Sequence, residues 1–234
     1  MKKILIVNDD GIEADGIIRL AKNAIKYGEV WVVAPESQRS AMSHSVTLRH
    51  PIEAWKYDFE IPGVHAYACD GTPADCARIG ILNIVPGKPD YVFSGINYGY
   101  NSATDIQYSA TAGAALEASF QGIHTIAFSE EANALHEGTD RYLDEIMGKL
   151  LEVYPGENRI WNVNFPATDV KGVLYDRKVS SDLYYSDEYR ETLLPNGHIS
   201  YMVNGTIQNK AEEGTDLRAI FDGYVSVGIV NNIN

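Results

Sequence analysis

The chain of 234 residues is 45% hydrophobic and 22% charged, a composition typical of a soluble globular protein with one large core. Its 32 acidic and 19 basic residues give a net charge of −13, which argues against nonspecific binding to nucleic acids or anionic membranes. The two cysteines, Cys69 and Cys76, match no zinc spacing and make no disulfide framework. No apolar run approaches the ~18 residues of a membrane span and no secretory leader is evident, so a cytoplasmic location is expected.

Predicted strands and helices alternate through the first two thirds of the chain. The expected strands are 2–7, 30–34, 64–69, 90–94, 123–128 and 159–163. The expected helices cover 17–25, 73–82, 112–121 and 139–153, and residues 36–50 form a polar loop. This alternation predicts an α/β fold with a doubly wound, mostly parallel sheet.

The pattern changes after about residue 170. Residues 173–207 are rich in Tyr, Val, Ser and Thr and contain the turn signal Pro195-Asn196-Gly197, which predicts a C-terminal β-hairpin extension. We therefore expect a catalytic core at 1–170 and, at 171–234, the hairpin extension and a C-terminal segment that mediate oligomerisation.

The most informative motif is Asn8-Asp9-Asp10-Gly11, where the first strand gives way to the first helix. Asp-Gly is also a hairpin signal, but residues 12–27 lack the alternation of a returning strand. Two adjacent carboxylates repel each other unless a cation or a proton relieves them, and ligands of open α/β sheets bind beyond the carboxyl ends of strands. The motif thus favours an oxygen-ligand site for a hard divalent cation over a plain acidic turn.

Two later strands are also followed by polar loops. The hydroxyls of 36–50 could bind a metal or phosphate, although a solvated loop explains them equally, and its His44 is a weak acid–base candidate. Asn97 offers a neutral oxygen ligand suited to Mg²⁺ or Mn²⁺. Ser109 and Thr111 open a helix, where they can act as caps and also leave N–H groups for an anion.

Together these loops supply two carboxylates, an amide, hydroxyls and a helix N-terminus, a set that fits metal-assisted hydrolysis of a phosphate ester. Two tyrosines flank this set. Tyr98 and Tyr100 are candidates for a surface on which a nucleotide base stacks, and packing into the core is the alternative for either ring.

The chain closely resembles the SurE family, the stationary-phase survival protein or 5′-nucleotidase family. The matching motifs occur in family order over nearly the whole chain. They are Asn8-Asp9-Asp10-Gly11, Val33-Ala34-Pro35, Gln38-Arg39-Ser40, Ser43-His44-Ser45, Asp70-Gly71-Thr72-Pro73-Ala74-Asp75-Cys76, Ser94-Gly95-Ile96-Asn97, Asp105 to Thr111, Asn162-Val163-Asn164-Phe165-Pro166, Gly214-Thr215-Asp216 and Gly223-Tyr224-Val225-Ser226-Val227.

The resemblance implies a Rossmann-like core and a metal-dependent phosphatase that hydrolyses nucleoside monophosphates, with 3′-nucleotidase and exopolyphosphatase activities left open. It implies one Mg²⁺ or Mn²⁺ ion and dimers or tetramers joined through C-terminal extensions. The family pattern places the metal on Asp9, Asp10, Ser40 and Asn97, and the phosphate near Asn101, Ser109 and Thr111. Asp9 or Asp10 would accept or relay a proton. Ala103 and Ala110 stand where the family often has glycine, and Gly228-Ile229-Val230 replaces its usual Thr-Pro-Leu.

Two functions of other classes stay open at this level. A nucleotide-binding regulator on the same fold would bind nucleotide without turnover. A metal-dependent nucleosidase would release free base in place of phosphate.

Overall fold

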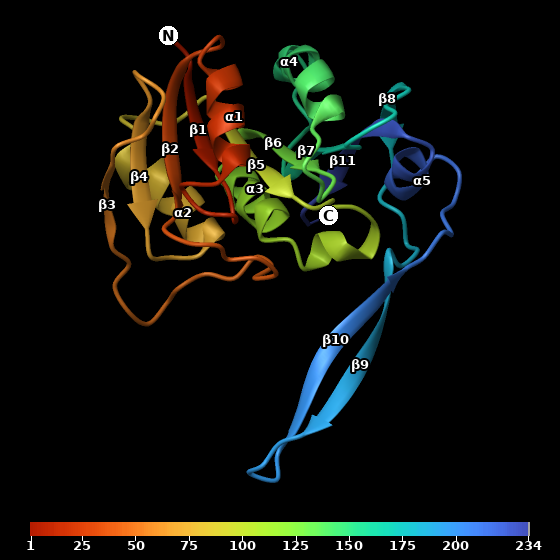
Figure 1. Ribbon diagram of the computed structural model, residues 1–234. Coiled ribbons are helices and arrows are strands. Elements are labelled where there is room, and N and C mark those ends of the chain that lie inside the picture. Colours follow the sequence, from red (N-terminus) through yellow and green to blue (C-terminus); the bar gives the residue numbers. More distant parts are fainter. Residues whose placement is uncertain (234) are drawn as a thin grey trace.

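The computed structural model describes residues 1–233 and consists of a nine-stranded sheet flanked by helices, with a separate two-stranded ribbon (Figure 1). The strands of the main sheet are β1 (Lys3–Val7), β2 (Glu29–Pro35), β3 (Ala54–Tyr57), β4 (His65–Cys69), β5 (Tyr91–Tyr98), β6 (His124–Glu130), β7 (Arg159–Phe165), β8 (Gly172–Arg177) and β11 (Tyr224–Asn231). The ribbon is formed by β9 (Tyr185–Leu193) and β10 (Ile199–Ile207). The helices are α1 (Asp15–Ala24), α2 (Pro73–Ile79), α3 (Ala110–Phe120), α4 (Glu137–Leu151) and α5 (Asp216–Phe221), with a π-helical turn η1 (Gly80–Ile84) and a 3₁₀ turn η2 (Ala103–Gln107).

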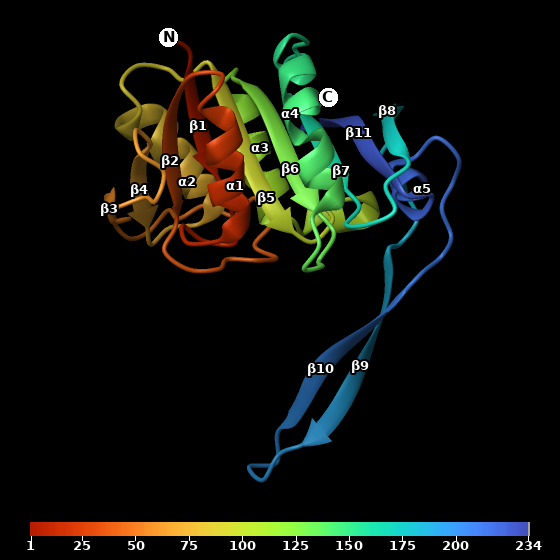
Figure 2. The same cartoon turned by 45° about the horizontal axis from the view of Figure 1, so that its top comes forward.

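Strand β1 shows why the sheet is covered on both faces. Ile4 and Ile6 point into the core formed with α1 and α4, whereas Leu5 and Val7 point into the core formed with α2 and α3. Successive side chains of a strand face opposite ways, so an uninterrupted apolar run needs helices on both sides. Figure 2 shows α1 and α4 on one side of the sheet and α3 on the other.

The strand order is β3-β4-β2-β1-β5-β6-β7-β11-β8. From β1 the chain winds outward first through β2 and then, after returning, through β5, β6 and β7, all parallel to β1. The direction of winding therefore reverses between β1 and β5. Open α/β sheets bind their ligands in the crevice beyond the strand ends at such a switch point. The predicted Rossmann-like, mostly parallel α/β fold is confirmed. Its topology indicates that a ligand site lies at the ends of β1 and β5.

The C-terminal part both completes the sheet and leaves it. Strand β11 pairs antiparallel with β7, and β8 pairs with β11, so the main sheet extends past the expected core boundary at residue 170. The division at that residue does not coincide with an edge of the sheet. The predicted hairpin is present but shorter than 173–207, because only β9 and β10 project from the body (Figure 2).

Several element boundaries differ from the predicted ones. Strand β5 continues through Gly95 to Tyr98, whereas the sequence predicts a loop there, and its pairing with β6 is irregular between Ser94 and Asn97. Helix α3 begins at Ala110, two residues earlier than expected, because Ser109 caps it. Within residues 1–233, no helix is long and apolar enough to cross a membrane.

Candidate active site

The turn after β1 brings the carboxylates to the switch point. Asn8 Nδ2 donates to the Gly11 carbonyl at 2.8 Å, which closes the turn around Asp9. Gly11 has a φ of +103°, and a Cβ there would lie 3.3 Å from the backbone of Ser37. Glycine thus lets the loop after β2 approach, and the Arg39 amide donates to the Asp9 carbonyl at 2.7 Å.

Asp9 is a buried carboxylate, 3% exposed, whose side chain accepts a hydrogen bond from the Thr111 hydroxyl. Burial, and to a smaller extent the charge of Asp10, raises the pKa of Asp9 to about 7. Within residues 1–233, no Lys, Arg or His forms an ion pair with Asp9 or Asp10. The two adjacent carboxylates are therefore left without a compensating side-chain cation.

Asp10 joins the ends of three segments. Its Oδ2 accepts a hydrogen bond from the Tyr98 amide at 3.0 Å, which links the end of β1 to the end of β5. Its Oδ1 lies 3.5 Å from Gln38 Nε2, and the same amide donates to Ser40 Oγ at 3.0 Å. The structure thus connects Ser40, which comes from the loop after β2, to Asp10 through one side chain. Burial raises the pKa of Asp10 as well.

Asn97 lies at the end of β5 in a network of amides. Its Nδ2 donates to the Gly99 carbonyl at 2.7 Å and lies 3.4 Å from Asn101 Oδ1, so donors face the loop and Oδ1 is the atom left for a cation. Asn101 is buried, and its Nδ2 donates to Ser129 at 2.7 Å. The hydrogen bond to Ser129 fixes the Asn101 side chain, and it also occupies the amide nitrogen that a ligand could otherwise bind.

The N-terminus of α3 meets the end of β1, because Thr111 binds Asp9. Ser109 Oγ accepts from the Ala112 amide at 2.9 Å as the helix cap, while the Thr111 hydroxyl is engaged by Asp9. The first turn of α3 carries no acidic residue of its own, and the carboxylate that lies against it is that of Asp9. Both predicted hydroxyls are occupied, so the positive end of the helix itself is what α3 offers an anion.

The two tyrosines have different environments. Tyr98 is 57% exposed, and its ring is available at the surface. The Tyr100 hydroxyl donates to Glu131 at 3.1 Å, and its ring packs edge-on against Tyr184 with centroids 6.2 Å apart. Burial raises the pKa of Tyr100. Only Tyr98 therefore presents an unoccupied aromatic surface.

The donors at this crevice suit a divalent cation. Within residues 1–233, no group of three or more His, Cys, Asp or Glu side chains is placed to hold a metal, so a cation at Asp9 and Asp10 would also need neutral oxygens. Ser40, in the loop after β2, and Asn97, at the end of β5, are the predicted sources of such oxygens. Asn8 Oδ1 is, in addition, buried without a hydrogen-bond partner in the described chain. The buried Asp9, the half-buried Asp10 and this orphaned oxygen, with no side-chain cation beside the carboxylates in the described chain, fit a bound cation better than an empty turn.

Sequence reasoning missed the residue that fixes the loop after β5. Asn164, fully buried on β7, accepts from the Asn101 amide at 2.8 Å and donates to the Asn101 carbonyl at 3.1 Å. Asn162 Nδ2 donates to the same carbonyl at 2.8 Å. The only available signal was the motif Asn162-Val163-Asn164, because polar residues alternating in a buried strand need buried partners.

Asn164→Ala should lower the free energy of unfolding by about 1–3 kcal/mol, because it leaves the buried Asn101 amide without an acceptor. Phosphate release should fall as well, since the loop that carries Asn101 loses its anchor. Denaturant melts and activity assays measure the two effects, with the exposed Asn209→Ala as the control variant. Equal stability of the two variants would show that Asn164 does not anchor the loop.

The His44 side chain is held by contacts with α3. Its Nε2 lies 2.9 Å from the Glu117 carboxylate, and its ring stacks on Phe120. Gly113 allows this approach, because a Cβ there would lie 2.3 Å from the Ser43 carbonyl oxygen. These contacts fasten the loop after β2 to α3.

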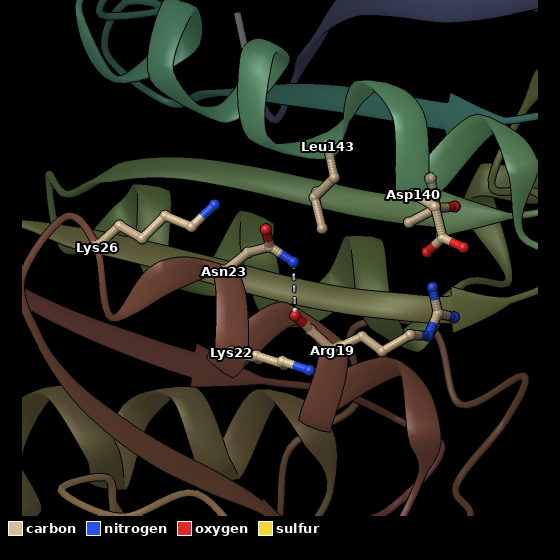
Figure 3. A pocket seen from close by; sticks show the side chains of 7 residues that line it. Arg19, Lys22, Asn23, Lys26, Asp140 and Leu143 are labelled. Carbon is tan, nitrogen blue, oxygen red and sulfur yellow. Dashed lines mark hydrogen bonds between the residues drawn. The ribbon is translucent and has the colours of Figure 1, made fainter.

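A basic cavity of about 300 Å³ lies between α1 and α4. Figure 3 shows Arg19 and Lys22 on α1 and Lys26 in the turn after it, with Asn23 Nδ2 donating to the Arg19 carbonyl at 3.0 Å. None of the predicted metal or phosphate residues lines this cavity. Arg19 connects it to the crevice, since its guanidinium also binds Glu130 at the end of β6.

Comparison with known proteins agrees with this geometry. Residues 4–183 match the family described as Survival protein SurE. A Thermoanaerobacter sp. protein named 5′-nucleotidase SurE is 37% identical over 230 residues, which cover 96% of this chain and 90% of that protein. A Thermus thermophilus protein named 5′-nucleotidase SurE 1 is 40% identical over 233 residues, covering 96% and 90%.

A solved structure extends the likeness to three dimensions. The crystal structure of the SurE protein from Aquifex aeolicus superposes with a TM-score of 0.84 at 34% identity, covering 99% of this chain and 94% of that one. The family match spans most of the chain, and relatives above 30% identity span nearly all of it. The resemblance seen in the sequence motifs is thereby confirmed, and the chain belongs to the Survival protein SurE family.

Proposed function

We propose that this protein is a divalent-metal-dependent 5′-nucleotidase that hydrolyses nucleoside monophosphates to nucleoside and phosphate. Nucleotidase activity is supported by family membership and by relatives named 5′-nucleotidase SurE that match 96% of the chain. The observation that carries the metal dependence is the buried Asp9 beside Asp10, with no side-chain cation paired to either within residues 1–233.

In this proposal, Asp9, Asp10, Ser40 and Asn97 hold one Mg²⁺ or Mn²⁺ ion. A bound ion of this kind polarises a phosphoryl oxygen and lowers the pKa of a bound water. Thr111 keeps the Asp9 carboxylate oriented through its hydroxyl. A bound cation favours the ionised form of both carboxylates, and an ionised Asp9 or Asp10 would accept or relay a proton of the attacking water.

The phosphate group would lie at the start of α3. Ser109 caps that helix and Thr111 reaches back to Asp9, so the two positions bring the helix N-terminus against the carboxylates. Asn101 would shape the phosphate side through its anchored backbone. Fixed N–H groups aimed at a transferring phosphoryl group stabilise the charge that develops on it.

The deciding experiment measures phosphate release from a panel of nucleoside 5′-monophosphates with Mg²⁺, with Mn²⁺ and with EDTA. We expect turnover that EDTA abolishes and added metal restores. Nucleotide binding without turnover would favour a regulator, and release of free base without phosphate would favour a nucleosidase. Activity that persists in EDTA after exhaustive metal removal would overturn the metal dependence.

Asn97→Ala should weaken metal affinity roughly tenfold or more and leave activity partly restorable at high Mn²⁺, because a neutral ligand contributes geometry more than charge. Asn97→Asp is the matched variant, since it keeps an oxygen at the same position. Titrating activity against Mn²⁺ gives the activation constant of each. A loss in Asn97→Ala that no Mn²⁺ concentration reverses would assign Asn97 to the phosphate.

We further propose that β9 and β10 join copies of this chain. Every residue of both strands is exposed, and they include large apolar side chains. The most exposed of these apolar side chains are Tyr189, Leu193, Ile199, Tyr201, Met202 and Val203. A lone two-stranded ribbon is marginally stable in water, and an apolar surface of this kind marks an interaction site. A second copy of the chain supplies the same surface in return.

A further inference from the structure

A cleft of about 460 Å³ opens beside the proposed metal site, between the start of α1 and the connection from β6 to α4. Its volume is in the range of small-molecule sites. Its lining combines one aromatic ring with carboxylates, amides and an imidazole. The residues that matter here are Asp10, Gln38, Tyr98, Glu130, Asn133 and His136.

The cleft adjoins the proposed metal site. Asp10 lines it, and the Tyr98 amide that binds the Asp10 carboxylate belongs to the same wall. Helix α1 packs on one face of the sheet and α3 on the other. A substrate with its phosphate at the start of α3 would therefore pass over the carboxyl ends of β1 and β5. The rest of the substrate would enter this cleft.

The charges of the cleft favour a neutral occupant. With Asp10 assigned to the proposed cation, Asp15 and Glu130 are the other carboxylates of the lining. Within residues 1–233 they share Arg19 as the one Lys or Arg that pairs with them, and His136 Nδ1 lies 3.2 Å from Glu130 Oε1. Glu130 is fully engaged, since it accepts from the Arg19 guanidinium and from Thr139 Oγ1 at 2.7 Å. A second phosphate or a polyphosphate chain would meet net negative charge here, so an uncharged group fits better.

The polar and aromatic groups of the cleft fit a nucleobase. The Tyr98 ring is 57% exposed, and aromatic faces stack on every base. Asn133 Oδ1 accepts from the Leu135 amide at 3.1 Å, which leaves Nδ2 as the donor for a ligand. Tyr100 does not line the cleft, because its hydroxyl and ring are directed to Glu131 and Tyr184.

We infer that this cleft binds the nucleoside half of the substrate, with the base stacked on Tyr98 and not on Tyr100. The inference rests on the proposed nucleotidase function. It explains how the enzyme would prefer nucleotides to simple phosphate esters while accepting several bases, because stacking does not depend on the pattern of hydrogen-bonding groups.

The test compares two substrates in the wild type, Tyr98→Ala and Tyr98→Phe. Adenosine 5′-monophosphate has a base, whereas glycerol 2-phosphate has no aromatic ring that could stack. In Tyr98→Ala we expect kcat/KM to fall roughly 5- to 100-fold for the nucleotide and to change less than about twofold for glycerol 2-phosphate. Tyr98→Phe should retain the nucleotide preference. Tyr154→Ala, 51% exposed and outside the cleft, is the matched control.

A second measurement separates this inference from the proposed function. Calorimetric titration with adenosine, which carries no phosphate, reports the cleft alone. Weaker adenosine binding in Tyr98→Ala supports the inference even if no phosphate is released from any substrate. Equal losses on both substrates, no loss on either, or adenosine affinity that is undetectable in the wild type or unchanged in Tyr98→Ala would overturn it.

Discussion

Asp9→Asn is expected to reduce metal-dependent phosphate release at least about 100-fold while leaving the fold intact. The substitution removes a charged ligand but keeps an oxygen that can accept the hydrogen bond from Thr111. Phosphate release at saturating Mn²⁺ measures the effect. Asp58→Asn, at an exposed acidic position, serves as the control and should retain full activity. Wild-type turnover in Asp9→Asn would remove Asp9 from the metal site.

The same variant should stabilise the metal-free protein at high pH. The folded-state pKa of Asp9, about 7, lies above the ordinary value of 3.8, so the ionised carboxylate costs stability as the pH rises from 4 through 7. Above pH 7, Asp9→Asn should therefore be more stable than the wild type by up to about 4 kcal/mol. Below pH 4 the two should agree. Denaturant melts in EDTA at pH 4 and pH 8 measure the difference, and a metal-free variant less stable at pH 8 would contradict it.

Deletion of residues 185–207 is expected to reduce the mass in solution from a dimer or tetramer to a single chain. The cut is placed where the ribbon begins, because the Gln208 amide donates to the Tyr184 carbonyl at 2.9 Å and a short Gly/Ser linker can join them. Removing the ribbon takes away exposed apolar surface that would otherwise be buried between copies. Light scattering on the purified variant gives the mass.

A pair of substitutions tests the ribbon without cutting the chain. Tyr189 and Val203 lie opposite each other on β9 and β10, so Tyr189→Ser with Val203→Ser removes one apolar cross-strand pair. Glu191→Gln on the same strand is the control and should leave the mass unchanged. If the deletion and the double substitution both keep the mass of the full chain, the ribbon does not join the copies.

Local patterns in the sequence predicted most of the strands and helices in the first two thirds of the chain and the position of the Asp9-Asp10 pair after the first strand. The apolar run before Asn8 is a buried strand because both of its faces are covered, and the helical spacing of Ile17, Leu20 and Ala21 is that of α1. The Asp9-Asp10 pair lies at the end of that strand. Such features depend on residues within one or two turns of each other, and they can therefore be recognised without knowing the fold.

Contacts between distant segments needed the tertiary structure. Nothing near residue 170 indicates that β11 pairs with β7, since that register joins residues more than 50 positions apart. Tyr98 and Tyr100 look equivalent in the sequence. In the structure, however, Tyr100 binds Glu131 and packs against Tyr184, whereas the Tyr98 ring is exposed. Strand pairing and burial depend on segments that are distant in the sequence. Each buried polar group needs a hydrogen-bond partner, and the fold can supply that partner from any part of the chain.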